Sequence, residues 1–434
     1  MSVCLSLVAL PAAGLHLIPV ASVPTDLWFD SHDGFEIEGD RLYVATGEGG
    51  FSAYEVATGT LQNTVAPPPT PQALTKAWSD FDTLAVADER VIVGARFRDS
   101  GGAIRPIAYV YDTNTSATPW VLAGDKDTVG GRLVGLATDG RYVASVGLVD
   151  SSIDGISTSR RQQVSVLDLE TGQVQQLVDV PEQAYDALLS VAIDDGLVVV
   201  GGYRELGQDR VAAFDAASGE KLRSWVSPRD LDTSFGSHVA VRGSSVFIGD
   251  SGERRPAYWW ESGVEVPGSD PHFASDLIDG DGDLGGGSGE GRNAAIYRFD
   301  LNESGATQSL LVSTLVADER WRAGEPSGLG IAMEVLGEWV FVGGGDQDGD
   351  GLSAGITAIN TRSGWASGDL VEQIEELDEA YSMTTSGGYV AIHGLYRDAS
   401  AARSQRIAIF RVVPEPATAA LFGAFLAMAG RRRG

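Results

Sequence analysis

The chain has 434 residues, of which 43% are hydrophobic, 55 are glycine and one is cysteine. Its formal net charge of −29, with no basic stripe to offset it, argues against nucleic acid as a partner and favours cations or cationic surfaces. The length and the abundance of turn residues predict a globular, mostly β protein, and a lone cysteine excludes an internal disulfide.

Residues 1–14 form a candidate signal segment ahead of the folded body. Met1 to Ala13 is largely apolar and ends in the small residues Ala12 and Ala13, as at many export cleavage sites. The segment contains no Lys or Arg, so it departs from the usual charged start of a signal peptide. Cys4 lies within it and would be lost on cleavage.

One unit recurs along residues 15–412: two strands joined by a tight turn, a variable loop, and a third strand. The tight turns carry pairs such as Gly39-Asp40, Asp139-Gly140 and Asp195-Gly196, which tolerate the backbone of a two-residue hairpin. The hairpins are expected at Phe35–Thr46, Thr83–Gly94, Leu133–Gly147, Ser190–Gly201, His238–Gly249, Ile331–Gly343 and Ser382–Gly394.

Eight segments read as third strands, with a mean step of about 51 residues, which is near the upper end of blade-repeat lengths. They are Phe51–Val56, Pro106–Asp112, Val164–Leu169, Val211–Asp215, Pro256–Trp260, Ala294–Asp300, Ile356–Asn360 and Arg406–Val412. The sixth would take its hairpin from the degenerate segment Ser275–Gly287. We therefore expect an all-β propeller of eight four-stranded blades, or seven if the Asp/Gly-rich unit is an insertion. The regular spacing disfavours a pair of β-sandwiches.

Several units offer a fourth strand, but the last does not, because a different kind of segment follows Val412. The candidate fourth strands are Thr60–Val65, Trp120–Ala123, Gln173–Val180, Lys221–Val226 and Gln308–Leu315. Leu15–Ala21 has the same character. If it completed the last blade, the ring would close without an exposed sheet edge at the seam.

Phe235-Gly236-Ser237-His238, followed by the turn Arg242-Gly243 and a second strand, resembles the FG-GAP repeat of integrin-α-like propellers. Two other units match it in outline, from Leu329-Gly330 and from Phe81-Asp82. The second of these has Asp82 in place of the repeat's glycine.

A second resemblance lies at the end of a third strand. Phe214-Asp215-Ala216-Ala217-Ser218-Gly219, with Trp225 downstream, is similar to the motif of quinoprotein propellers, whose tryptophan packs between blades. The adjacent cysteine pair of many quinoprotein dehydrogenases is impossible here, because Cys4 is the only cysteine.

Two acidic segments are candidate calcium sites, since alternate carboxylates in a Gly-rich loop can converge oxygen ligands on a hard cation. In the first, Asp279, Asp281 and Asp283 are followed by Glu290 at the twelfth position, but Leu284 stands at position six, where such loops have glycine.

The second acidic segment contains Asp346, Asp348 and Asp350. It has Gly351 at position six but Thr357 where the closing glutamate should be. For each segment, the alternative to a calcium site is a solvated acidic turn.

Residues 413–434 have the features of a targeting segment. The segment contains Pro414, Glu415 and Pro416, then an apolar run to Gly430, then Arg431, Arg432 and Arg433. These three parts in order resemble the PEP-CTERM sorting signal of bacterial exported proteins, which implies an exosortase-type processing enzyme as a partner. As a short hydrophobic helix, Ala417–Gly430 would span roughly 21 Å, less than the ~30 Å hydrocarbon core of a bilayer. A transient membrane pause is expected, with the arginines on the cytoplasmic side.

These observations predict an exported, cell-surface or extracellular, non-enzymatic propeller that binds a protein or polysaccharide through its loops, with calcium as the candidate cofactor. The preference for a binding protein depends on the sorting tail and on the lack of a catalytic constellation in the sequence. The alternative is an exported propeller enzyme, quinoprotein-like or a hydrolase, with an unrecognised site.

Overall fold

The computed structural model describes residues 15–25, 34–46, 49–67, 74–76, 83–99, 104–113, 120–123, 131–153, 156–182, 190–205, 208–226, 235–250, 295–301, 309–312, 329–344, 355–361, 366–370, 374, 377–397 and 402–414. Every regular element within these ranges is a β-strand. In this part of the chain no helix is long and apolar enough to cross a membrane. The expected C-terminal helix lies outside the described residues.

The strands form seven sheets. Taken from the inner to the outer strand, they are β2 (Phe35–Glu38), β3 (Arg41–Ala45), β4 (Phe51–Glu55) and β5 (Leu61–Val65) in blade 1; β7 (Leu84–Ala87), β8 (Arg90–Asp99), β9 (Ile104–Asp112) and β10 (Trp120–Ala123) in blade 2, where β6 (Leu74–Lys76) also pairs with β8; β11 (Gly131–Thr138), β12 (Tyr142–Ile153), β13 (Ile156–Asp168) and β14 (Val174–Glu182) in blade 3; and β15 (Ser190–Asp194), β16 (Leu197–Glu205), β17 (Gln208–Asp215) and β18 (Lys221–Val226) in blade 4.

The remaining three sheets complete the set. They are β19 (Phe235–Arg242), β20 (Ser245–Asp250), β21 (Ala295–Asp300) and β22 (Ser309–Val312) in blade 5; β23 (Leu329–Leu336), β24 (Trp339–Gly344), β25 (Gly355–Asn360) and β26 (Ala366–Asp369) in blade 6; and β27 (Leu377–Ser386), β28 (Tyr389–Arg397), β29 (Arg403–Pro414) and β1 (Leu15–Pro24) in blade 7.

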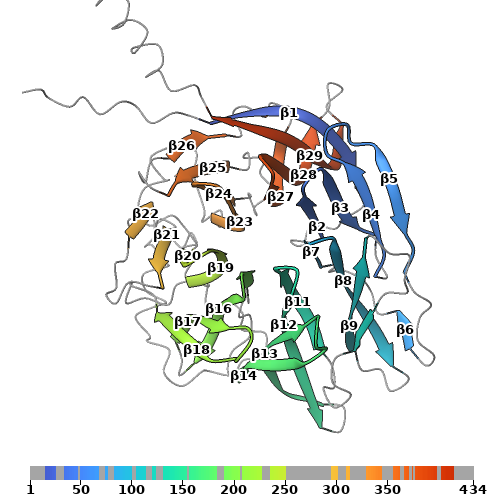
Figure 1. The fold of residues 1–434 in the computed structure, drawn as a ribbon, viewed down its shortest axis with the longest axis vertical. Coiled ribbons are helices and arrows are strands. Elements are labelled where there is room, and N and C mark those ends of the chain that lie inside the picture. Colours follow the sequence, from blue (N-terminus) through green and yellow to red (C-terminus); the bar gives the residue numbers. More distant parts are fainter. Residues whose placement is uncertain are drawn as a thin grey trace, which may run out of the picture.

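The inner strands of the seven sheets form a closed ring. Strands β2, β7, β11, β15, β19, β23 and β27 contact one another in that order, and β27 contacts β2. Figure 1 shows the sheets arranged radially around a common axis. The chain is therefore a β-propeller, as the repeat pattern predicts.

The described strands give seven blades, so the preferred count of eight is wrong and the alternative holds. Strand β20 pairs directly with β21, from Ser245↔Asp300 to Asp250↔Ala295. The hairpin at 238–249 thus takes its third strand from 295–300. Pro256–Trp260 and Ser275–Gly287, which were expected to supply strands of their own, lie outside the described residues.

The N-terminal strand completes the last blade, as predicted. Strand β1 pairs antiparallel with β29, from Leu15↔Pro414 to Pro24↔Arg406. The buried side chains of Leu15, Leu17 and Val23 fix β1 to the body. Strand β29 also runs to Pro414, two residues past the boundary expected at Val412.

All seven expected hairpins are present, because their turns carry residues suited to a tight reversal. Asp195 and Gly196 both adopt positive φ, 48° and 75°. Asp88 and Glu89 adopt the same left-handed backbone at 50° and 62° without a glycine, which is unusual for side-chain-bearing residues.

Hydrophobic clusters fill the spaces between neighbouring blades. Tyr43 and Phe51 of blade 1 pack with Tyr109 and Tyr111 of blade 2. Between blades 4 and 5, Trp225 is buried with its ring centroid 5.3 Å from that of Phe299. Trp225 therefore packs between two neighbouring blades.

Antiparallel pairing gives the ring two different faces. We call one of them the tight-turn face. It contains the turns between first and second strands, at 39–40, 88–89, 139–141, 195–196, 243–244, 337–338 and 387–388. It also contains the turns between third and fourth strands, including 56–60, 169–173 and 216–220. On the opposite loop face, second strands lead to third strands and each blade leads to the next. The tight-turn face is largely described, whereas most loop-face connections lie outside the described residues.

Candidate functional site: the two faces of the propeller

All seven predicted metal ligands fall on loop-face connections. Asp279, Asp281, Asp283 and Glu290 lie between β20 and β21, and Asp346, Asp348 and Asp350 lie between β24 and β25. All of them are outside the described residues. The described strand ends that flank the two segments are paired, Asp250 with Ala295 and Gly344 with Gly355. The two acidic segments therefore leave the same face of two neighbouring blades.

Within the described ranges, nowhere do three or more His, Cys, Asp or Glu side chains gather as a metal site. Of the predicted sorting residues, Pro414 belongs to β29. Glu415, Pro416 and the three terminal arginines lie outside the described residues.

The tight-turn face carries one hydrogen bond that recurs in every blade. In each, a backbone amide near or just after the end of the third strand donates to a carbonyl in the turn between the first and second strands. The seven bonds are Val56 to Asp40, Thr113 to Glu89, Leu169 to Arg141, Ala216 to Gly196, Leu301 to Ser244, Thr361 to Glu338 and Val412 to Gly388, all 2.7 to 3.0 Å long. They hold the end of each third strand beside the turn between the first and second strands.

A second set of hydrogen bonds closes the turn between third and fourth strands. The Asp215 carboxylate accepts hydrogen bonds from the Ser218 amide and hydroxyl, both at 2.7 Å, and the Gly219 amide bonds back to the Asp215 carbonyl. The hydroxyl bond, followed by the amide bond, lowers the pKa of Asp215.

Asp168 in blade 3 holds the equivalent turn. Its carboxylate accepts the amides of Glu170 and Thr171 at 2.8 and 3.0 Å. Partial desolvation alone would raise the pKa of Asp168, but these amides and Arg141 lower it. The sequence pattern of an acidic residue, two further residues, Ser or Thr, and Gly therefore has a structural purpose here.

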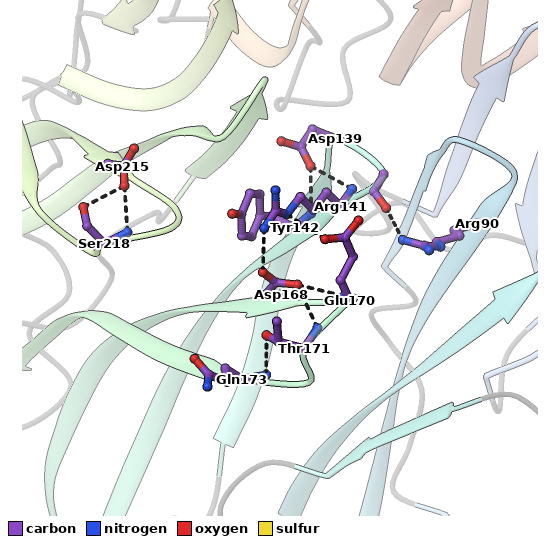
Figure 2. Close-up of polar contacts among 11 residues, drawn as sticks. Arg90, Asp139, Arg141, Tyr142, Asp168, Glu170, Thr171, Gln173, Asp215 and Ser218 are labelled. Atoms are coloured by element: carbon purple, nitrogen blue, oxygen red, sulfur yellow. Dashed lines mark hydrogen bonds and ion pairs between the residues drawn. The ribbon is translucent and has the colours of Figure 1, made fainter.

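Arg141 bridges the two turns of blade 3 (Figure 2). Its guanidinium lies 3.2 Å from Asp168 and 3.5 Å from Glu170, and stacks 4.9 Å from the Tyr142 ring centroid. The hydrogen bond to Asp168 is the main reason that the pKa of Arg141 is raised. With side-chain exposures of 53% for Arg141 and 62% for Glu170, these ion pairs contribute little to stability.

Acidic side chains also join neighbouring blades. Asp139 Oδ2 accepts the Gly196 amide at 2.7 Å, and Asp194 Oδ2 accepts the Gly243 amide at 2.6 Å. Glu38 accepts the amide of Glu89 at 3.3 Å, linking blades 1 and 2. In blades 1, 3 and 4, an acidic residue at or just before the turn thus caps the turn of the next blade. We call these the cross-blade caps.

Between blades 2 and 3 the link has another form. Arg90 donates to the Gly140 carbonyl (Figure 2), and the glycine leaves room for Asp88, whose carboxylate a Cβ at position 140 would overlap. The sequence signal for this arrangement was an acidic residue at the start of four successive turns, at 38, 88, 139 and 194. Sequence alone does not reveal its function, because the partners of these carboxylates are backbone amides of another blade.

The polar groups of the tight-turn face described above therefore stabilise the fold. The carboxylates of Asp139, Asp168 and Asp215 each accept at least two hydrogen bonds from turn amides or hydroxyls. Carboxylates engaged in this way fix the backbone and are poorly placed to act as general bases. Hydrogen bonds within and between blades hold the tight-turn face, and the loop face lies at the opposite ends of the strands.

No protein-family model and no curated protein sequence matches the chain. Similar solved structures include the computationally designed Ika8 protein, with 13% identity, a TM-score of 0.43, and coverage of 91% of this chain and 99% of that one. The β-propeller domain of the Trilobed protease from Pyrococcus furiosus has 11% identity and a TM-score of 0.42, covering 76% and 83%. BamB from Moraxella catarrhalis has 14% identity and a TM-score of 0.35, covering 91% and 83%.

Proposed function

We propose that the chain is an exported, non-enzymatic β-propeller of the cell surface or extracellular matrix, which binds a protein or polysaccharide partner through its loop face. The observation that carries this proposal is the tail: a Pro-Glu-Pro box, an apolar run and an arginine cluster, beginning where β29 ends. The tail resembles a PEP-CTERM signal, and an exosortase-type enzyme is its proposed processing partner.

The division between the two faces supports a binding role. Hydrogen bonds fix the described turns of the tight-turn face, whereas the longer connections leave from the loop face. Binding residues are commonly placed on loops that a rigid scaffold positions. The acidic segments at 279–290 and 346–350 belong to this face, and calcium is their proposed ligand.

The test of the sorting role compares the full chain with two variants in a bacterium that encodes an exosortase. One variant lacks residues 415–434, and the other replaces Arg431, Arg432 and Arg433 with alanine. The full chain should pause in the membrane fraction and then yield a shortened, exported product. Equal processing and equal distribution of all three proteins would refute the sorting role.

The calcium proposal is tested by calorimetric titration of a protein comprising residues 15–414, which retains the whole β1–β29 ladder. Binding with a raised melting temperature is expected, with losses on Asp281→Ala and Asp348→Ala. Glu220→Ala on the tight-turn face is the control for loss of charge alone. No heat and no shift would remove calcium from the proposal and leave the sorting role standing.

A further inference from the structure

The two described ends of the chain lie together on the rim of blade 7. Leu15, the first residue of β1, is the register partner of Pro414, the last residue of β29. Figure 1 shows the two strands alongside each other at the outside of the ring. The proposed sorting tail therefore leaves the body from a fixed point in the strand ladder.

This exit point is on the tight-turn face. The Val412 amide donates to the Gly388 carbonyl at 2.8 Å, which is the recurring bond found in all seven blades. The end of β29 is thus level with the turn at 387–388. In blades 1 and 4, the equivalent bonds place the turns at 56–60 and 216–220 on the same face.

The link between body and apolar run is short. Only Glu415 and Pro416 separate Pro414 from Ala417, so the Cα atoms of Pro414 and Ala417 can be at most about 11 Å apart. The far end of β29, at Arg403, is roughly 36 Å from Pro414 at the usual rise per strand residue. If a lipid surface holds the apolar run, this short link keeps that surface near the Pro414 end of β29. The loop face, at the far end of the strand, is then away from the lipid.

The net charge of the tight-turn face determines which kind of lipid surface it can approach without electrostatic repulsion. Among the described turn residues of this face and the strand residues that flank them, acidic residues outnumber basic ones. The basic residues are Arg41, Arg90, Arg141, Lys221 and Arg242, and the acidic ones are Glu38, Asp40, Glu55, Asp88, Glu89, Asp112, Asp139, Asp168, Glu170, Asp194, Asp195, Asp215, Glu220, Asp300 and Glu338. An anionic bilayer would repel this face within a Debye length of about 10 Å at 0.1 M salt. A zwitterionic surface would not oppose its approach.

We propose that, while its tail is inserted in a lipid surface, the propeller stands with the tight-turn face toward the membrane and the loop face directed outward. The orientation rests on the proposed function of the tail as a membrane segment. It makes the loop face the surface that an extracellular partner meets, and it keeps the cross-blade caps on the membrane side.

The test uses single-cysteine variants of the full chain in a Cys4→Ser background. Ala57 and Ala217 occupy equivalent exposed positions in the tight turns of blades 1 and 4, and the exposed Ala402 precedes β29 at the opposite end of blade 7. Each is replaced by cysteine and labelled with a fluorescent donor. Energy transfer is measured to an acceptor on the headgroups of phosphatidylcholine vesicles. Unchanged melting temperatures confirm that the variants fold.

We expect transfer efficiency at Ala57→Cys and Ala217→Cys to be at least twice that at Ala402→Cys. If the chain co-floats with vesicles but Ala402→Cys gives equal or stronger transfer, the orientation is wrong and the membrane role of the tail survives. If the full chain floats no better than a variant lacking residues 415–434, the membrane role itself fails. The two failures are therefore distinguishable.

Discussion

The carboxylate of Asp139 in blade 3 accepts the backbone amide of Gly196 in blade 4 at 2.7 Å. The same side chain accepts the amides of Arg141 and Tyr142 in its own turn, at 3.1 and 2.8 Å. Figure 2 shows the bonds within the turn. One residue therefore fixes the shape of a turn and the position of the next blade relative to it. Asp194 repeats the cross-blade bond one blade further on.

Replacing Asp139 should weaken the junction between blades 3 and 4. Asp139→Ala leaves three turn amides without their acceptor, and we expect the free energy of unfolding to fall by about 1–2 kcal/mol. Denaturant titration measures the loss. Asp40→Ala is the matched control, because the cross-blade cap of blade 1 comes from Glu38, and it should change stability by less than about 0.5 kcal/mol. Equal effects would show that the cap contributes nothing.

Closure of the ring can be tested on two neighbouring residues of β1. Leu17 is 5% exposed, whereas Ile18 is 49% exposed. Leu17→Ala should lower the free energy of unfolding by about 2–3 kcal/mol, because it leaves a cavity between β1 and the core. Ile18→Ala should cost about 0.5 kcal/mol or less. Similar losses in thermal and denaturant melts would contradict the burial of β1 in blade 7.

Much of this fold could be predicted from local sequence, since each hairpin carries turn residues that specify it. The blade count could not. Pro256–Trp260 has the composition of a third strand, but strand composition does not reveal which strands pair. The partner of Ser245–Asp250 is 45 residues further along the chain, at Ala295. Long-range pairing of this kind is a property of the assembled ring.

The features of the candidate site were likewise only partly predictable from the sequence. The motif at Asp215 was visible in the sequence, although its function in closing a turn was not. The cross-blade caps depend on amides that come within reach only when blades pack, such as Gly196 beside Asp139. The acidic segments remain a prediction from ligand spacing.

The turn at 88–89 should be improved by glycine. Glu89 adopts a φ of 62°, a left-handed conformation that costs a side-chain-bearing residue about 1–2 kcal/mol. Glu89→Gly should therefore raise the free energy of unfolding by up to about 1 kcal/mol, once the greater freedom of glycine in the unfolded chain is included. Glu170→Gly, in a turn where no positive φ occurs at that position, should be destabilising instead. A lower melting temperature for Glu89→Gly would contradict the strain.

The hydrogen bonds to Asp215 predict a specific loss of stability in acid. Because the Ser218 hydroxyl and amide lower the pKa of Asp215, its folded-state pKa lies below its unfolded value of about 3.9. The stabilisation is thus complete well above the unfolded pKa, begins to fall as pH approaches it, and is lost as pH falls through the folded-state pKa. Ser218→Ala removes the larger cause, so the difference in unfolding free energy between the unsubstituted protein and this variant should shrink below pH 4. Ser218→Thr keeps the hydroxyl and should restore the original pH dependence. A difference that stays constant from pH 7 to pH 3 would show that Ser218 does not act through the charge of Asp215.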